Sequence, residues 1–414
     1  MGISINIIKS FGIKIINLIH LKKLLRGIKY NFKNRKIRRK ISFDLMKEKK
    51  ININILNVIN NVLTYTSNLS RKDNAIDEYY YSYSSGQSVL YASVYAILLR
   101  GLVGDLDKLS ESENLNLSDH INSYQHEDGL YRDPYLSNEA ADVIDWWGWR
   151  HLSTHVVTAL TILHSKTKIP FRILDELYGK GKSEKWISSL DWESNATNVS
   201  NTVMNYGIML QYDRDFHNIK AADLALKEIY DWLNKHQDPE TGLWGNKSFK
   251  SPQKLSNAVQ TAYHIWILYC YDKKPIQYLE KCIDSCLKTQ NEFGGFGLKP
   301  NSSACEDIDS IDPLCRFYFM TNHRKRDIET ALRKAVYWIL LNHNEDGGFV
   351  FRRFEHFAYG HELMTTKADE SAMFPTWFRM LSLAYISRVF TDLQIYDDCT
   401  FQFPQCPGYQ FWKN

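Results

Sequence analysis

A turn that recurs along the chain at a fixed spacing constrains the fold more than any other feature. Four copies share a glutamine or histidine, then a glycine, then an aromatic residue: Gln125 to Tyr131, Gln237 to Trp244, Gln290 to Phe296 and His343 to Phe349. Gly242, Gly295 and Gly348 follow one another at intervals of 53 residues, and Gly129 precedes Gly242 by 113, close to two intervals. A fixed period of this length indicates stacked structural repeats. Six units of about 54 residues fill positions 75 to 390, with a degenerate unit near Trp192 and a further unit around 79 to 86.

Helical patterns of two kinds flank these turns. Before a turn the apolar residues are spaced by three and four, as in 222–235 and 330–342. After a turn comes a polar loop and then a more uniformly apolar stretch, as in 154–163, 259–271 and 375–385. An amphipathic helix belongs on the outside of a fold and a helix that is apolar all round belongs inside. Alternating them six times predicts an all-α (α/α)6 toroid over residues 60–414, behind an N-terminal arm of residues 1–55.

The residues before each turn carry a family resemblance. An aromatic or similar residue and an aliphatic one stand just ahead of the glutamine or histidine, as Trp232-Leu233, Trp338-Ile339 and, more loosely, His120-Ile121. This resembles the QW repeat of terpene cyclases of the squalene-hopene type and of the related protein prenyltransferase β subunits. In such a repeat the glutamine bonds exposed backbone groups at a helix end, so the turn residues are expected to be architectural and to lie outside the active site.

The most informative candidate site is an acidic segment. Glu306, Asp307, Asp309 and Asp312 place four carboxylates within seven residues, and their mutual repulsion raises at least one pKa. The resemblance to class II terpene cyclases, whose acidic DxDD motif follows such a turn, implies that Asp309 protonates an alkene or epoxide while Asp307 positions its proton. Ser310 stands where that motif has its last Asp. The alternative is a solvated acidic loop that caps the following helix.

Two other segments between a turn and an inner helix hold unusual polar and aromatic residues. We expect His151 to join Glu306, Asp307 and Asp309 as a catalytic group. The expected substrate-binding residues are Trp147, Trp149, Arg150, Tyr359, His361, Glu362, Glu370 and Arg379. Aromatic side chains there stabilise carbocations or stack on sugar rings, and arginines bind phosphates or carboxylates.

The sequence therefore predicts an enzyme and leaves its class open. The first hypothesis is a terpenoid cyclase, acting as an isomerase or lyase, that starts the cyclisation of an isoprenoid by protonation from Asp309. The alternative is a carbohydrate-active enzyme, of glycosidase or polysaccharide lyase type, acting on an acidic or lipid-linked glycan. A non-catalytic scaffold and a zinc site of prenyltransferase type remain open, the latter using Asp307 or Asp312, Cys305 or Cys315, and His361. The main hypotheses need no cofactor and no metal.

Charge is distributed unevenly along the chain. Residues 1–50 hold 15 Lys and Arg against Asp44 and Glu48, a net charge of +13, whereas the remaining 364 residues have a net charge of −9. The arm is expected to form a basic amphipathic helix, either on an anionic membrane surface or packed on the body. An acidic body disfavours nucleic acid as a partner. Seven cysteines and no export signal indicate the cytoplasm, with peripheral membrane association open. The tail from 397 to 414 is expected to wrap over the body as an irregular closure.

Overall fold

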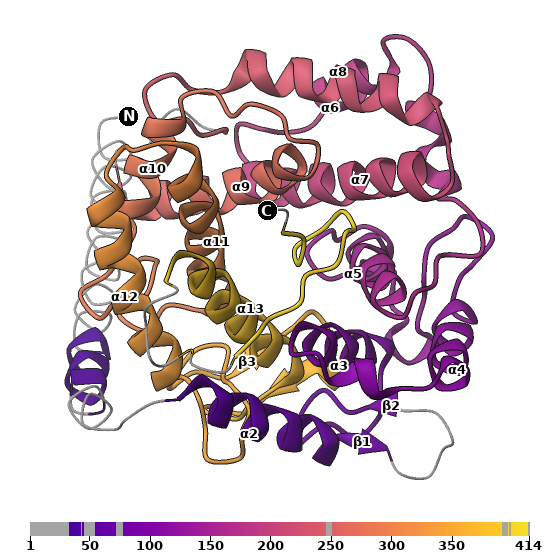
Figure 1. The fold of residues 1–414 in the computed structure, drawn as a ribbon. Helices are drawn as coiled ribbons and strands as arrows, with labels where there is room; N and C mark the ends of the chain where they lie inside the picture. Colours follow the sequence, from indigo (N-terminus) through magenta and orange to yellow (C-terminus); the bar gives the residue numbers. More distant parts are fainter. Residues whose placement is uncertain are drawn as a thin grey trace, which may run out of the picture.

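The computed structural model describes residues 33–42, 44, 54–71, 78–245, 251–390, 396 and 399–412. It is an all-α (α/α)6 toroid (Figure 1). The inner ring consists of α3 (Leu90–Leu102), α5 (Trp149–Ile162), α7 (Ala196–Phe216), α9 (Pro252–Tyr271), α11 (Ala304–Met320) and α13 (Met373–Val389). Each inner helix packs against the next, and α13 packs against α3, so the ring is closed.

The outer layer alternates with the inner ring along the chain. It consists of α2 (Ile55–Asn68), α4 (Glu111–Asn122), α6 (Lys182–Ser188), α8 (Ala221–His236), α10 (Leu279–Leu287) and α12 (Lys325–Leu341). Two small antiparallel sheets pair β1 (Ser70–Arg71) with β2 (Glu78–Tyr79) and β3 (Phe357–Ala358) with β4 (Thr365–Thr366). Five short 3-10 helices lie among the described connections: Asp105–Lys108, Pro134–Leu136, Glu139–Asp142, Arg172–Leu177 and Glu362–Met364.

Burial separates the two layers as their sequence patterns predict. Every residue of α13 from Met373 to Ile386 is buried, because this helix has neighbours on all sides. The outer helix α8 buries one stripe only, made of Ala222, Ala225, Leu226, Ile229, Tyr230 and Leu233. The three-and-four spacing therefore marks the face that an outer helix packs on the ring.

The recurrent turns are architectural, as predicted. The amide Nε2 of Gln290 donates to the carbonyl of Gly294 within its own turn at 3.0 Å and to that of Ala331 in α12 at 2.8 Å. Gln125 and Gln237 likewise bond their own turns and the backbone ahead of the next outer element. Gly294 has a φ of +102°, and a Cβ there would lie 2.5 Å from the Lys334 carbonyl oxygen. The turn therefore needs glycine both for its conformation and for its close approach to α12.

Part of the N-terminal arm packs on the body. Residues 33–42 are helical, and Ile37 and Ile41 are buried against Trp338 and Leu341 of α12. For residues 33–42 this contact agrees with the expectation that the arm packs on the body. Residues 1–32, where the amphipathic pattern is strongest, lie outside the described residues. Among the described helices, none is both long enough and apolar enough to span a membrane.

The C-terminal tail enters the ring instead of wrapping over it, which corrects the expectation for this segment (Figure 1, yellow). The Gln410 amide accepts from the Trp377 indole at 2.7 Å and donates to the Leu98 carbonyl at 3.0 Å. Cys406, Tyr409 and Phe411 are buried. The segment has no regular secondary structure from 399 to 412, yet it packs as part of the core.

Candidate active site in the ring centre

The candidate site lies where the inner helices begin, and we call this end of the ring the N-terminal mouth. Backbone hydrogen bonds join helix starts to neighbouring turns there: Met373 N donates to Tyr81 O at 2.9 Å, and Ala304 N donates to Phe351 O at 3.0 Å. Because α11 starts at this mouth, its first turns carry the acidic segment into the ring.

Asp307 is held by four donors, one of which is a buried cation. Its carboxylate accepts from Phe296 N at 2.7 Å, Ser302 Oγ at 2.7 Å, Trp338 Nε1 at 2.8 Å and Arg379 Nη1 at 2.9 Å. The side chains of Asp307 and Arg379 are each 1% exposed. Burial raises the pKa of Asp307, and Arg379 and the other donors oppose this. In this arrangement the Asp307 carboxylate links α11 to Trp338 of α12 and to Arg379 of α13.

Two further carboxylates of the segment are also paired. Glu306 closes a capping box with Ser303 at the start of α11 and bonds Arg352 Nη2 at 2.8 Å. Asp312 bonds Arg316 Nε at 2.5 Å. Three of the four predicted carboxylates thus each have a guanidinium partner.

Asp309 is the exception. Its side chain is 4% exposed and has no hydrogen-bond partner among the described residues. Burial, and then the neighbouring carboxylates Glu306, Asp307 and Asp312, raise the pKa of Asp309 well above its usual range. It is close enough to Tyr263 of α9 and Tyr409 of the tail to raise their pKa values as well. The site therefore favours the protonated, neutral form of Asp309, which is the form that a proton donor requires.

A hydrogen-bonded group of phenols surrounds a histidine near the start of α5. His151 Nδ1 lies 3.0 Å from Tyr91 OH and 3.3 Å from Tyr359 OH, and Tyr359 OH lies 2.9 Å from Tyr95 OH. Tyr409 also approaches His151, with ring centroids 6.4 Å apart. Burial lowers the pKa of His151 well below its usual range, so its imidazole is neutral and is a weaker base than a solvated histidine.

The wall around this centre has two unlike sides. The side formed by α3, α13 and the tail is aromatic: Tyr359 stacks on Phe374 with centroids 4.5 Å apart, and Tyr95 stacks on Trp377 at 5.2 Å. The side formed by α7 and α9 carries polar groups, and there Ser200 Oγ lies 2.9 Å from His264 Nδ1. His264 is near enough to lower the pKa of His151, and burial lowers its own pKa to about 3. One centre thus offers both ring faces and hydrogen-bonding groups.

The remaining predicted residues lie around the mouth. Trp147 and Trp149 are buried, and Trp147 packs against Gly360 so closely that a Cβ on that glycine would meet its indole. Arg150 Nε bonds Asp145 Oδ1 at 2.6 Å, and Thr202 donates to the other oxygen of that carboxylate. His361 caps its own short 3-10 helix.

Two glutamates predicted to bind substrate lie in the loop that leads to α13. Glu362 is exposed, whereas Glu370 accepts from Ser84 N and Ser84 Oγ, each at 2.9 Å. The structure thus brings Asp309, His151 and Tyr359 together in the centre and leaves Glu362 and Glu370 at the rim. The substrate-binding roles of the rim residues stay predictions.

Sequence reasoning missed several members of the centre. Tyr91 and Tyr95 are spaced by four residues on a helix that is otherwise apolar, a spacing that puts both side chains on one helix face. That signal is present in the sequence but weak. Tyr409 has no signal of this kind, because the tail lies outside the repeats.

No metal centre is formed by the described residues, since nowhere among them do three or more His, Cys, Asp or Glu side chains gather in a way that could hold an ion. The residues of the zinc alternative all belong to this described part. The seven cysteines are free thiols.

Comparisons with known proteins add little beyond these observations. No family model and no curated protein matches the sequence. Among solved structures, a selenomethionine derivative of the GH76 α-mannanase BT2949 of Bacteroides thetaiotaomicron aligns over 82% of this chain and 98% of its own, at 14% identity and a TM-score of 0.46. A family 76 glycoside hydrolase from a bovine Bacteroides thetaiotaomicron strain aligns over 80% of this chain and 78% of its own, at 11% identity and a TM-score of 0.44. Likeness at this level assigns no activity to this chain.

Proposed function

We propose that this protein is a carbohydrate-active enzyme that binds one end of a glycan in the ring centre and protonates it from Asp309. The observation that carries the proposal is a buried carboxyl group, Asp309, that has no guanidinium partner among the described residues and whose pKa is raised by burial and by its carboxylate neighbours, close to Tyr263 of α9 and Tyr409 of the tail. A sugar ring has the same two-sided character as the wall of the centre, because its C–H face stacks on aromatic rings while its hydroxyl edge seeks hydrogen bonds.

The chemistry follows from the two protonation states. Asp309 donates its proton to the glycosidic oxygen as the bond from that oxygen to the anomeric carbon breaks. Water adds to the anomeric carbon, and its oxygen is then positively charged and strongly acidic, so that even a weakly basic neutral imidazole, His151 or His264, accepts the proton that it loses. The leaving sugar departs as an alcohol, and proton transfer from the imidazolium to the Asp309 carboxylate restores the starting state.

Substrate access has a defined route in this proposal. The tail fills the ring from the end opposite the N-terminal mouth, so a chain end enters through that mouth. The rings of Tyr359 and Phe374 are in contact beside the acid. Binding therefore requires the β3–β4 loop, which carries Tyr359, to move aside.

Charge favours a neutral glycan over the acidic one expected from the sequence. Three arginines around the mouth are each bonded to a carboxylate: Arg150 to Asp145, Arg352 to Glu306 and Arg379 to Asp307. A uronate carboxylate would have to compete with these pairs for its counter-ion.

The terpenoid cyclase remains a second candidate because of the aromatic side. Tyr95, Tyr359, Phe374 and Trp377 would stabilise a carbocation formed when Asp309 protonates an alkene. A hydrocarbon substrate would form no hydrogen bonds with Ser200 and His264, which is why this candidate stands second.

One experiment separates the two. Purified protein is incubated with a panel of neutral and acidic oligosaccharides, read by mass spectrometry, and in parallel with squalene and prenyl diphosphates, read by gas chromatography. We expect glycan products and a loss of about 10²- to 10⁴-fold in Asp309→Asn. The control Asp231→Asn changes an exposed carboxylate on α8 and should keep full activity. Isoprenoid products that depend on Asp309 would replace the glycan proposal by the cyclase, and no turnover of either class by folded protein would contradict both.

A further inference from the structure

One aromatic side chain of the tail lies across the ring. Tyr409 is 4% exposed. Its ring stacks on His155 of α5 with centroids 5.3 Å apart, and it lies 5.9 Å from the ring of Tyr263 of α9 and 5.6 Å from that of Phe378 of α13. These three helices alternate with α3, α7 and α11 around the ring, so no two of them are neighbours. A side chain that contacts all three lies near the axis of the ring and closes the space between them.

The same side chain lies close to the candidate acid. Burial raises the pKa of Tyr409 well above its usual range, and Asp309 is the nearby group that raises it most. The hydroxyl of Tyr409 forms no hydrogen bond with a described residue. A buried hydroxyl in this state is able both to donate a hydrogen bond to a ligand and to accept one. Tyr409 therefore offers a polar contact as well as an aromatic surface beside Asp309.

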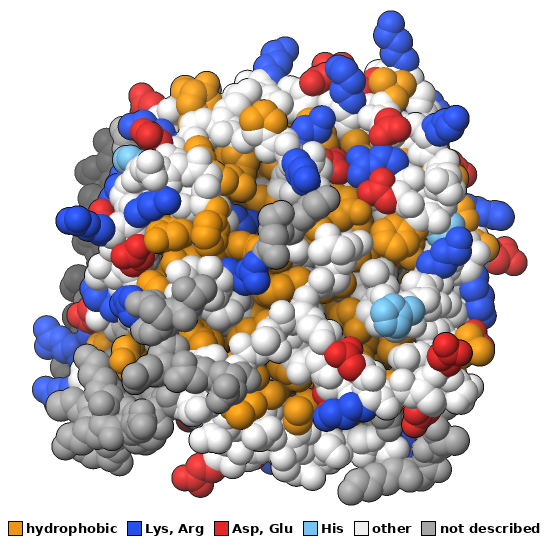
Figure 2. All heavy atoms as spheres, in the orientation of Figure 1, with side chains coloured by type: hydrophobic (Ala, Val, Ile, Leu, Met, Phe, Trp, Pro, Cys, Tyr) orange, Lys and Arg blue, Asp and Glu red, His pale blue; other side chains and the backbone are white. Residues whose placement is uncertain are grey.

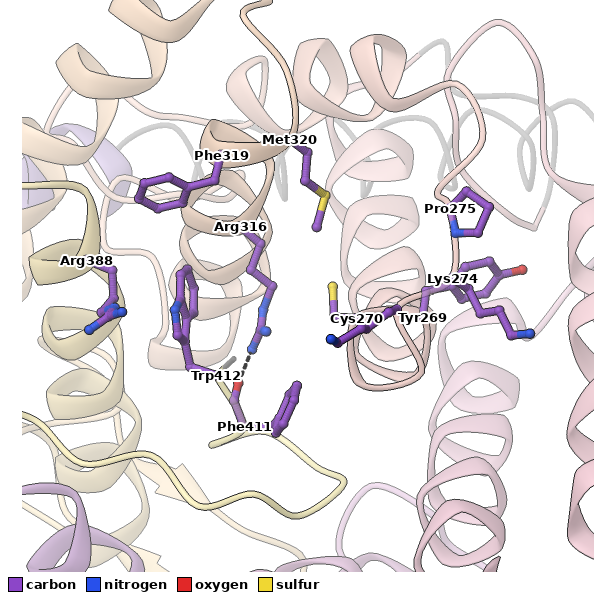
Figure 3. A pocket seen from close by; sticks show the side chains of 11 residues that line it. Tyr269, Cys270, Lys274, Pro275, Arg316, Phe319, Met320, Arg388, Phe411 and Trp412 are labelled. Atoms are coloured by element: carbon purple, nitrogen blue, oxygen red, sulfur yellow. Dashed lines mark hydrogen bonds between the residues drawn. The ribbon is translucent and has the colours of Figure 1, made fainter. Parts of the chain in front are cut away.

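The backbone on both sides of this phenol is anchored. Tyr385 of α13 donates its hydroxyl to the carbonyl of Tyr409, and the Gln410 amide bonds both α3 and α13. Further on, Arg316 Nη2 donates to Phe411 O at 2.5 Å, which Figure 3 shows as a dashed line. Figure 2 shows hydrophobic side chains gathered around the ring centre, where the tail lies in the same view of Figure 1. Withdrawal of the tail would break these contacts, so the phenol has a fixed position.

We propose that Tyr409 forms the floor of the substrate site and limits it to one sugar unit, so that the enzyme releases single sugars from the ends of glycan chains. This inference rests on the proposed function, in which a glycan end enters through the N-terminal mouth and Asp309 protonates the glycosidic oxygen. Because Tyr409 lies close to Asp309, the unit that supplies the anomeric carbon already reaches the floor. A second unit would need the space that the phenol occupies, and a steric clash of this kind excludes a ligand.

The test follows the products formed from neutral tri- to hexasaccharides of glucose, mannose, xylose or galactose in water labelled with a heavy oxygen isotope. The water adds to the anomeric carbon, so the label marks the fragment that the ring held. We expect the wild type to release mainly labelled monosaccharide. Tyr409→Ala removes the floor and should raise the share of labelled disaccharide at least tenfold, as measured by mass spectrometry.

Two variants separate the floor from a general loosening of the tail. Tyr409→Phe keeps the ring and loses the hydroxyl, so it should still release monosaccharide and should raise KM. Phe403→Ala removes a different aromatic contact of the tail, with Tyr385 at 5.6 Å between centroids, and should leave the products unchanged. If circular dichroism shows that Tyr409→Ala does not fold, Tyr409→Leu takes its place, because leucine keeps apolar packing with a shorter side chain.

The outcomes distinguish this inference from the proposed function. A wild type that releases mainly labelled fragments of two or more units would overturn the inference and leave Asp309 as the proton donor. A folded Tyr409→Ala or Tyr409→Leu variant with the products of the wild type would do the same. If folded wild type cleaves no glycan, the proposed function itself is contradicted, and the inference with it.

Discussion

The two ends of the ring are each held by a buried ion pair on α11, and the pairs differ in what they hold. At the N-terminal mouth Arg379 bonds Asp307 and gives its other donors to Val350 O and Phe351 O, within a repeat unit. At the other end Arg316 bonds Asp312 and the tail carbonyl of Phe411, and it stacks on Trp412. One pair thus fixes the repeats to one another and the other fixes an irregular segment to the repeats. Between them Asp309 has no such cation among the described residues.

The largest loss of stability is expected from breaking the Arg379–Asp307 ion pair at the N-terminal mouth. Arg379→Leu leaves Asp307 buried without its counter-ion and should lower the free energy of unfolding by about 3–5 kcal/mol. Arg352→Leu removes a more exposed partner of Glu306 and should cost clearly less. Urea denaturation of both variants measures the difference. Equal losses would mean that burial does not distinguish the two pairs.

The second prediction concerns the glycine of a repeat turn at the same mouth. Gly294→Ala puts a Cβ 2.5 Å from the Lys334 carbonyl at a φ of +102°, and should cost more than about 1 kcal/mol. Gly86→Ala is the control, since a Cβ there has no atom within 4 Å and no positive φ applies. Thermal unfolding of the two variants checks this, and a Gly86→Ala variant as unstable as Gly294→Ala would contradict it.

The third prediction sharpens the contrast between Asp309 and its paired neighbours. Because its folded-state pKa is raised, the wild-type protein loses stability as pH rises from about 4, where the unfolded chain ionises this group, toward the folded-state pKa. Asp309→Asn removes this loss and should raise the free energy of unfolding at pH 7 above that of the wild type. Denaturation curves at pH 4 and pH 7 test the sign. A variant that is less stable than wild type at pH 7 would show that Asp309 is ionised and paired.

The smallest effects are expected at the rim. Glu370→Gln weakens the bonds to Ser84 and should cost about 0.5–1.5 kcal/mol. Glu362→Gln, on an exposed side chain, should stay within about 0.5 kcal/mol of wild type. If Glu362 binds substrate as the sequence predicts, its variant should raise KM without a change in thermal stability. An unchanged KM would remove it from the site.

The sequence predicted the ring because each repeat unit contains its own structural signals. Gly294, Gln290 and the spacing to the next turn are all local, so they are readable without the fold. The crowding of carboxylates, which is visible along one segment, indicated a group with a raised pKa, and the resemblance to the DxDD motif implied that this group is Asp309. Arg379 shows the limit: its type and place suggested a substrate-binding role, and only the packing of α13 on α11 reveals that Asp307 occupies its guanidinium. Tyr409 shows the same limit, because its neighbours lie far from it in sequence.

The way the tail enters the ring also determines how this chain has to fold. Neighbouring inner helices come from adjacent repeats, so most of the ring forms through contacts between nearby segments. Closure of the ring instead needs contacts between distant segments. Met373 N donates to Tyr81 O, and Gln410 Nε2 donates to Leu98 O across a separation of 312 residues. Contacts of such high sequence separation form slowly. We therefore expect an open-ring intermediate that exposes the aromatic wall to solvent and to other copies of the chain, and whose last step is insertion of the tail.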